Sequence, residues 1–213
     1  SGLGNFFNER WMAADKKRFI EPRDFFELFA DEPLRFTPGM SREYSNAGFI
    51  VLGAIVEAVS GQAYADYVER NIFTPAGMEQ SGFELRDGRN ESHAIGYAPF
   101  GKDGELVPNL GMLPIKGCPA GSSMHTAKDL LRFDTALRDG TLLAPEWTAW
   151  LFDSPEQLSE ATYEIGVAGG APGVSAGLES DGLVIAIVLS NFDPPTGDAL
   201  ARELYAALRD DNL

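Results

Sequence analysis

A tyrosine and an asparagine two positions apart, Tyr44-Ser45-Asn46, follow Phe36-Thr37-Pro38-Gly39 and open the apolar run Ala47–Val59. An extended backbone directs residues i and i+2 to the same side. If Tyr44 and Asn46 precede the helix, both can reach one cleft, where a phenol can transfer protons and an amide can orient a substrate carbonyl. The alternative is structural: Asn46 is the N-cap of the helix, and Tyr44 packs against its first turn.

The elements that must position this pair belong to a mostly helical region that we expect to span residues 1–160. Residues Pro22–Ala30 show a helical pattern. Ala47–Val59 is apolar on nearly every face, which is typical of a helix buried on all sides, and Gly61 is a suitable stop for it. A second helix is predicted over Tyr64–Phe73, and the two should pack as a pair.

The chain from Gly82 to Pro119 is rich in Gly, Pro, Asn and Asp and has no clear periodicity, which predicts a long irregular segment with short strands. Thr126 and Asp129 have the spacing of a helix start, so a helix is predicted over Ala127–Arg138, with Gly140 after it. A further short helix is predicted over Ala144–Phe152, led by Pro145.

Residues 161–213 should form antiparallel strands and a closing helix of the same fold. Val174–Ser180 and Leu183–Ser190 flank Asp181-Gly182, a strong hairpin signal. The second strand does not alternate, which favours cover on both faces. The helix that follows carries Leu200, Leu204 and Leu208 on one stripe and can supply one of these covers.

Composition narrows the classes of function. The chain has 213 residues and a net charge of -15, which disfavours binding to nucleic acid or to anionic membrane surfaces. Cys118 is the only cysteine, so no internal disulfide can form. No apolar run reaches the length of a membrane span, and no signal peptide is visible. The chain opens without a start methionine, so we expect it to begin inside a larger coding sequence.

Gly173-Val174-Ser175-Ala176-Gly177 matches the Gly-x-Ser-x-Gly nucleophile elbow. That motif needs a helix directly after it and a histidine later in the chain. Here a hairpin follows, and both histidines, His93 and His125, come before Ser175. We therefore interpret the segment as a bend at which glycines let a strand turn or let backbone approach a ligand.

Metal and cofactor chemistry have no supporting pattern. Neither histidine has a partner at metal-ligand spacing, and no glycine loop ends in Lys-Ser or Lys-Thr. Gly169–Gly173 lacks the lysine of a phosphate loop and leads into a strand, which suits an edge against which a substrate lies. We expect no metal and no cofactor.

Taken in order along the chain, these segments resemble the serine β-lactamase and penicillin-binding-protein superfamily, above all class C β-lactamases, D-alanyl-D-alanine carboxypeptidase-like proteins and related esterases. The likeness covers nearly the whole chain. It is carried by Ser1-Gly2-Leu3-Gly4, Phe36–Gly39, Tyr44-Ser45-Asn46, Val59-Ser60-Gly61, Thr74–Met78, Pro119–Ser123, Thr126–Leu130, Gly169–Gly173 and Leu189-Ser190-Asn191.

The resemblance implies a serine hydrolase that works through an acyl-enzyme on an amide, ester or β-lactam carbonyl. By position, Tyr44 would carry protons and Asn46 would bind the substrate. Gly169 and Gly170 would lie on the edge strand, with the N–H of Gly170 in an oxyanion hole. The family's nucleophile belongs to a Ser-x-x-Lys motif. No serine of this sequence has a lysine three residues later, so we expect that motif upstream of Ser1.

A second departure concerns the basic residue that the family places before a small residue and a glycine. Val167 stands at that position, followed by Ala168 and Gly169. Because valine cannot bind a carboxylate, neutral esters or amides are favoured. The connection from Tyr163 to Gly166 also looks short for the family.

The predicted fold is therefore α+β, of the β-lactamase/transpeptidase-like kind: a helical region on an antiparallel sheet with a C-terminal helix, incomplete at the N-terminus. The expected partner is a small-molecule or peptide-like substrate. A non-catalytic member that keeps the cleft for binding or as a scaffold is the alternative. The resemblance alone suggests a periplasmic or secreted location, and the oligomeric state is left open.

Overall fold

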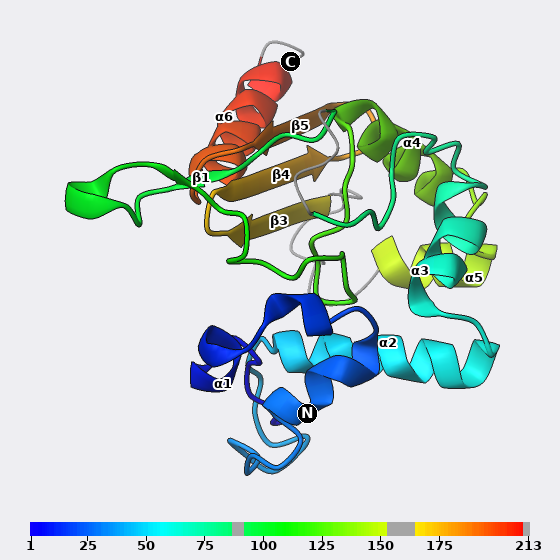
Figure 1. The fold of residues 1–213 in the computed structure, drawn as a ribbon. Coiled ribbons are helices and arrows are strands. Elements are labelled where there is room, and N and C mark those ends of the chain that lie inside the picture. Colours follow the sequence, from blue (N-terminus) through cyan, green and yellow to red (C-terminus); the bar gives the residue numbers. More distant parts are fainter. Residues whose placement is uncertain (87–91, 153–164, 211–213) are drawn as a thin grey trace. The chain divides into compact units, whose positions relative to one another are not determined.

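The computed structural model describes residues 1–86, 92–152 and 165–210. It contains helices and antiparallel strands, so the α+β prediction is confirmed (Figure 1). The chain divides into two compact units, each of which is described by itself. Unit 1 lies within Ser1–Glu69, Gly82–Asn90 and Gly111–Met124, and unit 2 lies within Arg70–Ser81, Glu91–Leu110 and His125–Leu213.

Unit 1 is built around an aromatic core. Trp11, Phe6, Phe19 and Phe25 are buried and pack ring against ring, with centroids 5.1–6.3 Å apart. Burial of such large apolar surfaces is the main stabilising contribution available to a unit of this size. The elements of the unit are helices α1 (Glu9–Ala13), α2 (Asn46–Ser60) and α3 (Tyr64–Val68) and the 3-10 helices η1 (Lys16–Arg18) and η2 (Pro22–Leu28).

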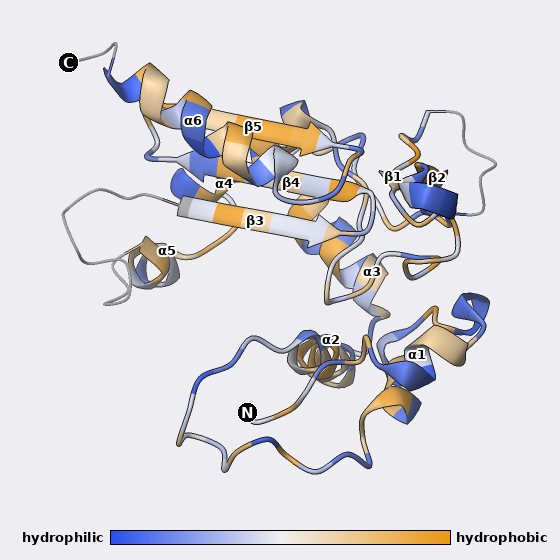
Figure 2. Cartoon of the chain, turned by 90° about the vertical axis from the view of Figure 1, so that its left-hand side faces the viewer, coloured by the Kyte–Doolittle hydropathy of each residue, from blue (hydrophilic) through white to orange (hydrophobic). Residues whose placement is uncertain are grey.

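Helix α2 reaches this core through Ala47 and Ile50. It ends at Gly61, whose φ of 68° is the left-handed conformation that glycine adopts without strain, as predicted. The expectation that α2 is buried on all sides is wrong within the described residues. Figure 2 colours most of the helix hydrophobic, yet one stripe of large apolar side chains is 42–83% exposed: Phe49, Leu52, Ile55 and Val59.

Helix α3 packs against α2, as expected of the helical pair. The predicted helix Tyr64–Phe73 forms in two parts, because α3 continues as the π-helix η3 (Glu69–Phe73). The predicted irregular segment contains the two-residue strands β1 (Tyr97–Ala98) and β2 (Val107–Pro108), which pair antiparallel and belong to unit 2, with the 3-10 helix η4 (Lys102–Gly104) between them.

The larger sheet of unit 2 has the order β3-β4-β5 and is antiparallel throughout: β3 (Ile165–Ala171), β4 (Val174–Ser180) and β5 (Ile185–Ser190). The predicted hairpin at Asp181-Gly182 is confirmed. Its turn is held by the Asp181 carboxylate, which accepts from the backbone N–H groups of Leu183 and Val184 at 2.9 and 2.8 Å. Strand β5 therefore begins two residues later than predicted.

Helices lie on both faces of this sheet, which explains why β5 is apolar without alternation. Ser175 and Ser180 of β4 are five positions apart and so point to opposite faces. The Oγ of Ser175 accepts from the backbone N–H of Gly197 in α6 (Thr196–Asp210) at 2.9 Å. The Oγ of Ser180 donates to Asp134 of α4 (Ala127–Arg138) at 3.0 Å.

The face of α6 that meets the sheet differs from the predicted one. Gly197 and Ala201 are buried, whereas the leucine stripe of α6 remains about 43% exposed. Close approach decides this: a Cβ on Gly177 of β4 would lie 2.8 Å from the Cβ of Ala201. Only small residues on both elements allow the helix to come so near the strand. The stripe consists of Leu200, Leu204 and Leu208.

Helix α4 begins as predicted, with the Thr126 hydroxyl accepting from the Asp129 backbone N–H at 3.2 Å. The Asp129 side chain is fully buried and accepts three further hydrogen bonds, from the backbone N–H of Gln80, the hydroxyl of Ser81 and the guanidinium of Arg132, at 2.8–2.9 Å. Its burial opposes ionisation, but these donors outweigh it and lower the pKa of Asp129. The predicted short helix is α5 (Pro145–Phe152).

Candidate active site

The entrance of α2 is organised by Ser45. Its Oγ accepts from the backbone N–H of Gly48 at 2.9 Å, so Ser45 is the N-cap. The same hydroxyl donates to the carbonyl oxygen of Gly4 at 2.6 Å. A backbone bond from Arg35 N–H to the Gly2 carbonyl at 2.9 Å holds the same N-terminal segment. Ser45 thus fixes both the start of the helix and the N-terminal segment that contains Gly4.

Tyr44 and Asn46 are brought together by this start. The phenol oxygen of Tyr44 lies 3.3 Å from Oδ1 of Asn46, within hydrogen-bond distance. Asn46 is the first residue of α2, so it does not precede the helix, as the interpretation with an extended backbone required. The structural alternative named Asn46 as the N-cap, but the N-cap is Ser45. Tyr44 does pack on the first turn, with its ring 5.6 Å from that of Phe49, while 69% of it stays exposed.

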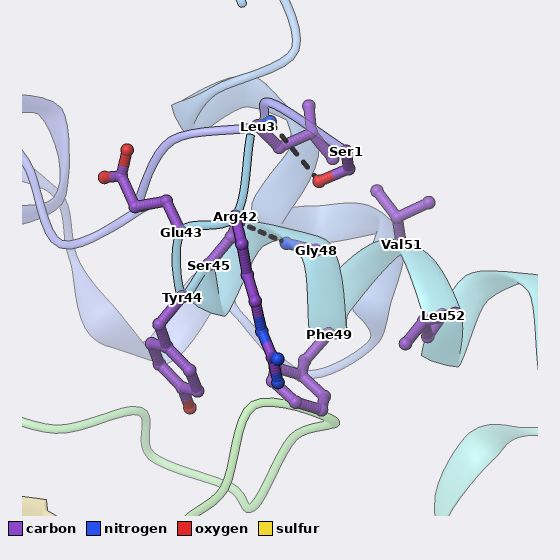
Figure 3. Close-up of a pocket in the computed structure, with 10 residues that line it drawn as sticks. All are labelled: Ser1, Leu3, Arg42, Glu43, Tyr44, Ser45, Gly48, Phe49, Val51 and Leu52. Atoms are coloured by element: carbon purple, nitrogen blue, oxygen red, sulfur yellow. Dashed lines mark hydrogen bonds between the residues drawn. The ribbon is translucent and has the colours of Figure 1, made fainter. Parts of the chain in front are cut away.

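A hollow of about 530 Å³ is lined by Tyr44 but not by Asn46. Figure 3 shows the side chains of Tyr44, Arg42 and Phe49 extending to the same side of the chain, and that of Glu43 extending away from them. Gly48, Val51 and Leu52 of α2 form an apolar wall, and Ser1 and Leu3 complete the lining. The lining residues of the hollow therefore include a phenol, a guanidinium, a carboxylate and hydrocarbon side chains.

The second set of predicted residues lies in unit 2, on β3, an edge strand of its sheet. Val167 is 57% exposed, and Ala168, Gly169 and Gly170 are exposed as well. Gly170 faces Pro194, because a Cβ at that position would lie 2.6 Å from Cγ of the proline. The exposed backbone of this strand can donate hydrogen bonds to a ligand laid along it.

The structure thus brings Tyr44 and Asn46 together within unit 1, and Val167, Ala168, Gly169 and Gly170 together within unit 2. Ser175 is 1% exposed and hydrogen-bonded to α6, so it is not accessible as a nucleophile. This agrees with the interpretation of Gly173–Gly177 as a bend and not a nucleophile elbow. Residues 163 and 164, where the family connection looked short, lie outside the described residues.

Two other reactive side chains of the described residues, Cys118 and His125, have pKa values shifted by burial. Burial raises the pKa of the Cys118 thiol to about 11, which keeps it protonated. Burial lowers the pKa of His125, whose ring meets that of Phe73 edge-on at 5.4 Å. Across residues 1–86, 92–152 and 165–210, no group of three or more His, Cys, Asp or Glu side chains is arranged to hold a metal ion.

The same residues contain no single helix that is long and apolar enough to cross a membrane; one bent pair, Asn46–Ser60 with Tyr64–Phe73, passes that test by length and composition together.

Sequence reasoning missed two residues of this site. Ser45 precedes Gly48 by three positions, which is an N-cap spacing that could have been recognised. Asn5 had no such signal: its Oδ1 lies 3.3 Å from Nδ2 of Asn46, 41 positions further along the chain. Contacts of that separation depend on tertiary folding, and periodicity does not reveal them.

Comparison with known proteins places these features in context. A family model described as Beta-lactamase matches residues 1–210. The putative penicillin-binding protein PbpX of Bacillus subtilis is 30% identical over 149 residues, which cover 69% of this chain and 36% of that protein. Penicillin-binding protein 4* of the same organism is 28% identical, over 64% of this chain and 33% of that protein. The chain therefore spans about a third of the length of these curated relatives.

Solved structures of known proteins also superpose on this chain. The penicillin-binding protein from Bacillus halodurans superposes with a TM-score of 0.85 at 31% identity, over 95% of this chain and 68% of that one. A D-stereospecific amidohydrolase from Streptomyces sp. has a TM-score of 0.75 at 22% identity, over 94% of this chain and 67% of that one. The second likeness is a likeness of fold.

Proposed function

Because the chain belongs to the β-lactamase family, we propose that it supplies active-site residues of a serine hydrolase that cleaves an amide or ester through an acyl-enzyme. The observation that carries the proposal is the hydrogen-bonded pair of Tyr44 and Asn46 at the entrance of α2, of which Tyr44 lines an open hollow. A phenol and a carboxamide in contact supply a proton carrier and a substrate-orienting group at one place.

In the proposed reaction, the oxygen of a serine hydroxyl adds to the substrate carbonyl carbon, and its proton passes to the lysine of the Ser-x-x-Lys motif. Tyr44 receives that proton as it gives its own to the leaving nitrogen or oxygen. The bond to the leaving group then breaks. Water hydrolyses the resulting ester by the reverse proton path, which releases the acid and restores the serine. Asn46 holds the substrate amide or ester during these steps.

Gly170 is proposed to donate its N–H to the oxyanion. Pro172 and Gly173 form a two-residue turn between Ala171 and Val174, the residues that flank it. Residues that flank such a turn are joined by its hydrogen bond. Since bonded and non-bonded pairs alternate along an antiparallel ladder, the next pair, Gly170 opposite Ser175, is non-bonded, and the N–H of Gly170 points off the open edge.

Val167 supports the assignment of a neutral substrate. It lies on the same exposed strand, three residues before Gly170, and offers hydrocarbon where a substrate carboxylate would need a cation. We therefore propose an ester or amide without a carboxylate at that end. The nucleophile is proposed to lie in the complete protein outside these 213 residues, because no Ser-x-x-Lys occurs among them.

The test is covalent labelling of the complete protein. Incubation with a fluorophosphonate followed by intact-mass measurement should show one phosphonyl adduct per chain. Peptide mapping should place it on the serine of a Ser-x-x-Lys motif. A complete protein whose mass does not change would overturn the hydrolase proposal.

An unchanged mass would instead favour the second candidate, a family member that binds ligands without turning them over. The specific observations behind this candidate are Val167 and the lack of Ser-x-x-Lys within the sequence. It predicts saturable, non-covalent binding of an ester or amide, measurable by calorimetry, with the ligand recovered intact.

A further inference from the structure

Asn46 is connected to a residue that neither the motif nor the family likeness singles out. Its Nδ2 lies 3.3 Å from Oδ1 of Asn5, in the segment that Ser45 holds against the start of α2. The Oδ1 of Asn5 also accepts from the backbone N–H of Phe7 at 3.1 Å. A carbonyl oxygen has two lone pairs and can accept both bonds.

These contacts fix the direction of each hydrogen bond in turn. The backbone N–H of Phe7 can only donate, so the atom of Asn5 that faces it is the oxygen. An oxygen there requires a donor from Asn46, which turns Nδ2 of its amide toward Asn5. The remaining amide atom of Asn46, Oδ1, then faces the phenol oxygen of Tyr44, and the phenol must donate.

We infer that Asn5 is a positioning residue, which sets the orientation of the Asn46 amide and, through it, the direction of the Tyr44 hydroxyl. A reversed Asn46 amide would place two oxygens against each other at Asn5 and remove the acceptor from Tyr44. In the observed orientation one N–H of Asn46 binds Asn5, and its second N–H can bind a substrate carbonyl. The lone pairs of the Tyr44 oxygen then face the incoming proton, and as that proton arrives the hydroxyl releases Asn46 and gives its own proton to the leaving group.

This inference rests on the proposed function and is tested in the complete protein by the rate of acylation with a chromogenic ester. Asn5→Ala should lower kcat/KM about tenfold, the size of one lost hydrogen bond. Asn5→Asp should stay within about twofold, because a carboxylate oxygen accepts the same two bonds. Rescue by aspartate distinguishes positioning from mere side-chain volume.

Two further variants separate positioning from stability. Asn8 caps α1 through a bond from the Trp11 N–H, so Asn8→Ala removes an asparagine from the same unit and should lower the melting temperature without lowering kcat/KM. In an Asn46→Ala background, Asn5→Ala should have no further effect, because the group through which it acts is gone.

The outcomes are distinct. A wild-type protein that is not acylated overturns the proposed function, and the inference with it. An acylated wild type whose Asn5→Ala variant keeps its kcat/KM overturns the inference alone, as do losses for Asn5→Ala and Asn46→Ala that simply multiply.

Discussion

The hydroxyl of Ser45 donates to the carbonyl oxygen of Gly4 over 2.6 Å, although the two residues are 41 positions apart in the chain. Since the same oxygen accepts from Gly48, one side chain joins the start of α2 to the N-terminal segment. Tyr44 and Asn46, on either side of Ser45, have their positions set by this junction.

Ser45→Ala should therefore destabilise the complete protein by about 2 kcal/mol, the sum of a lost helix cap and an unpaired carbonyl. Urea unfolding followed by circular dichroism measures this. Ser60→Ala, at the other end of α2, removes only a local bond to Gln62 and should change the free energy of unfolding by less than about 0.5 kcal/mol. Equal effects of the two variants would contradict the role of Ser45.

Tyr44→Phe should lower kcat by about a hundredfold, the smaller end of the range for loss of a proton carrier. The ring keeps its packing on Phe49, so the melting temperature should not change. Steady-state turnover of an ester by the complete protein measures the effect. Tyr97→Phe, in β1 of unit 2, is the matched control and should turn over normally; unchanged kcat for Tyr44→Phe removes Tyr44 from the mechanism.

Val167→Lys should change substrate preference. An ammonium group on the exposed β3 strand should lower the KM for a substrate with a free carboxylate about tenfold, and leave that of its neutral methyl ester unchanged. Val167→Met adds length without charge and serves as the control. If methionine has the same effect as lysine, charge is not what this position controls.

Gly53→Ala should destabilise the protein by about 1–3 kcal/mol. A Cβ on Gly53 would lie 2.0 Å from Cγ of Pro119, so α2 and the loop that carries this proline must separate. Gly48→Ala in the same helix meets only ordinary contacts, the nearest at 3.4 Å, and should be neutral or stabilising by up to about 1 kcal/mol. The difference between the two urea midpoints is the measured quantity.

Asp129 should contribute to acid sensitivity. Its pKa in the folded protein is lowered, so its stabilisation is present above the unfolded-state value near pH 4 and is lost as pH falls through the folded value. Asp129→Asn should cost about 3 kcal/mol at pH 7 and flatten the pH dependence of unfolding below about pH 4. Asp103→Asn, at an exposed position of η4, should change the free energy of unfolding at pH 7 by less than about 0.5 kcal/mol.

Local signals predicted most of the helices and the hairpin, because caps, glycine stops and turn residues act within a few positions. The sequence also identified Tyr44, Asn46 and the β3 glycines as candidates, through spacing and order. It could not predict that α6 would turn Gly197 and Ala201 to the sheet, since that choice depends on the space above Gly177. Nor could it predict Asn5, because its bond to Asn46 exists only after folding.

The exposure of α2 was misjudged for a related reason. A run of apolar residues indicates that a helix has apolar surface on several faces. The pattern does not identify which other segments pack against those faces. Phe49, Leu52, Ile55 and Val59 satisfy the pattern of a buried helix while remaining exposed in the described chain.

The backbone passes between the two compact units five times, at the junctions that follow Glu69, Ser81, Asn90, Leu110 and Met124. No single peptide-bond cleavage can therefore release either unit intact, and neither can be expressed as one uninterrupted fragment. Ribosomal synthesis delivers the last piece of unit 1 only after more than half of the chain has emerged. Unit 1 can complete its folding only after Met124 has been synthesised. Its assembly is therefore late and depends on contacts between residues that are distant in sequence.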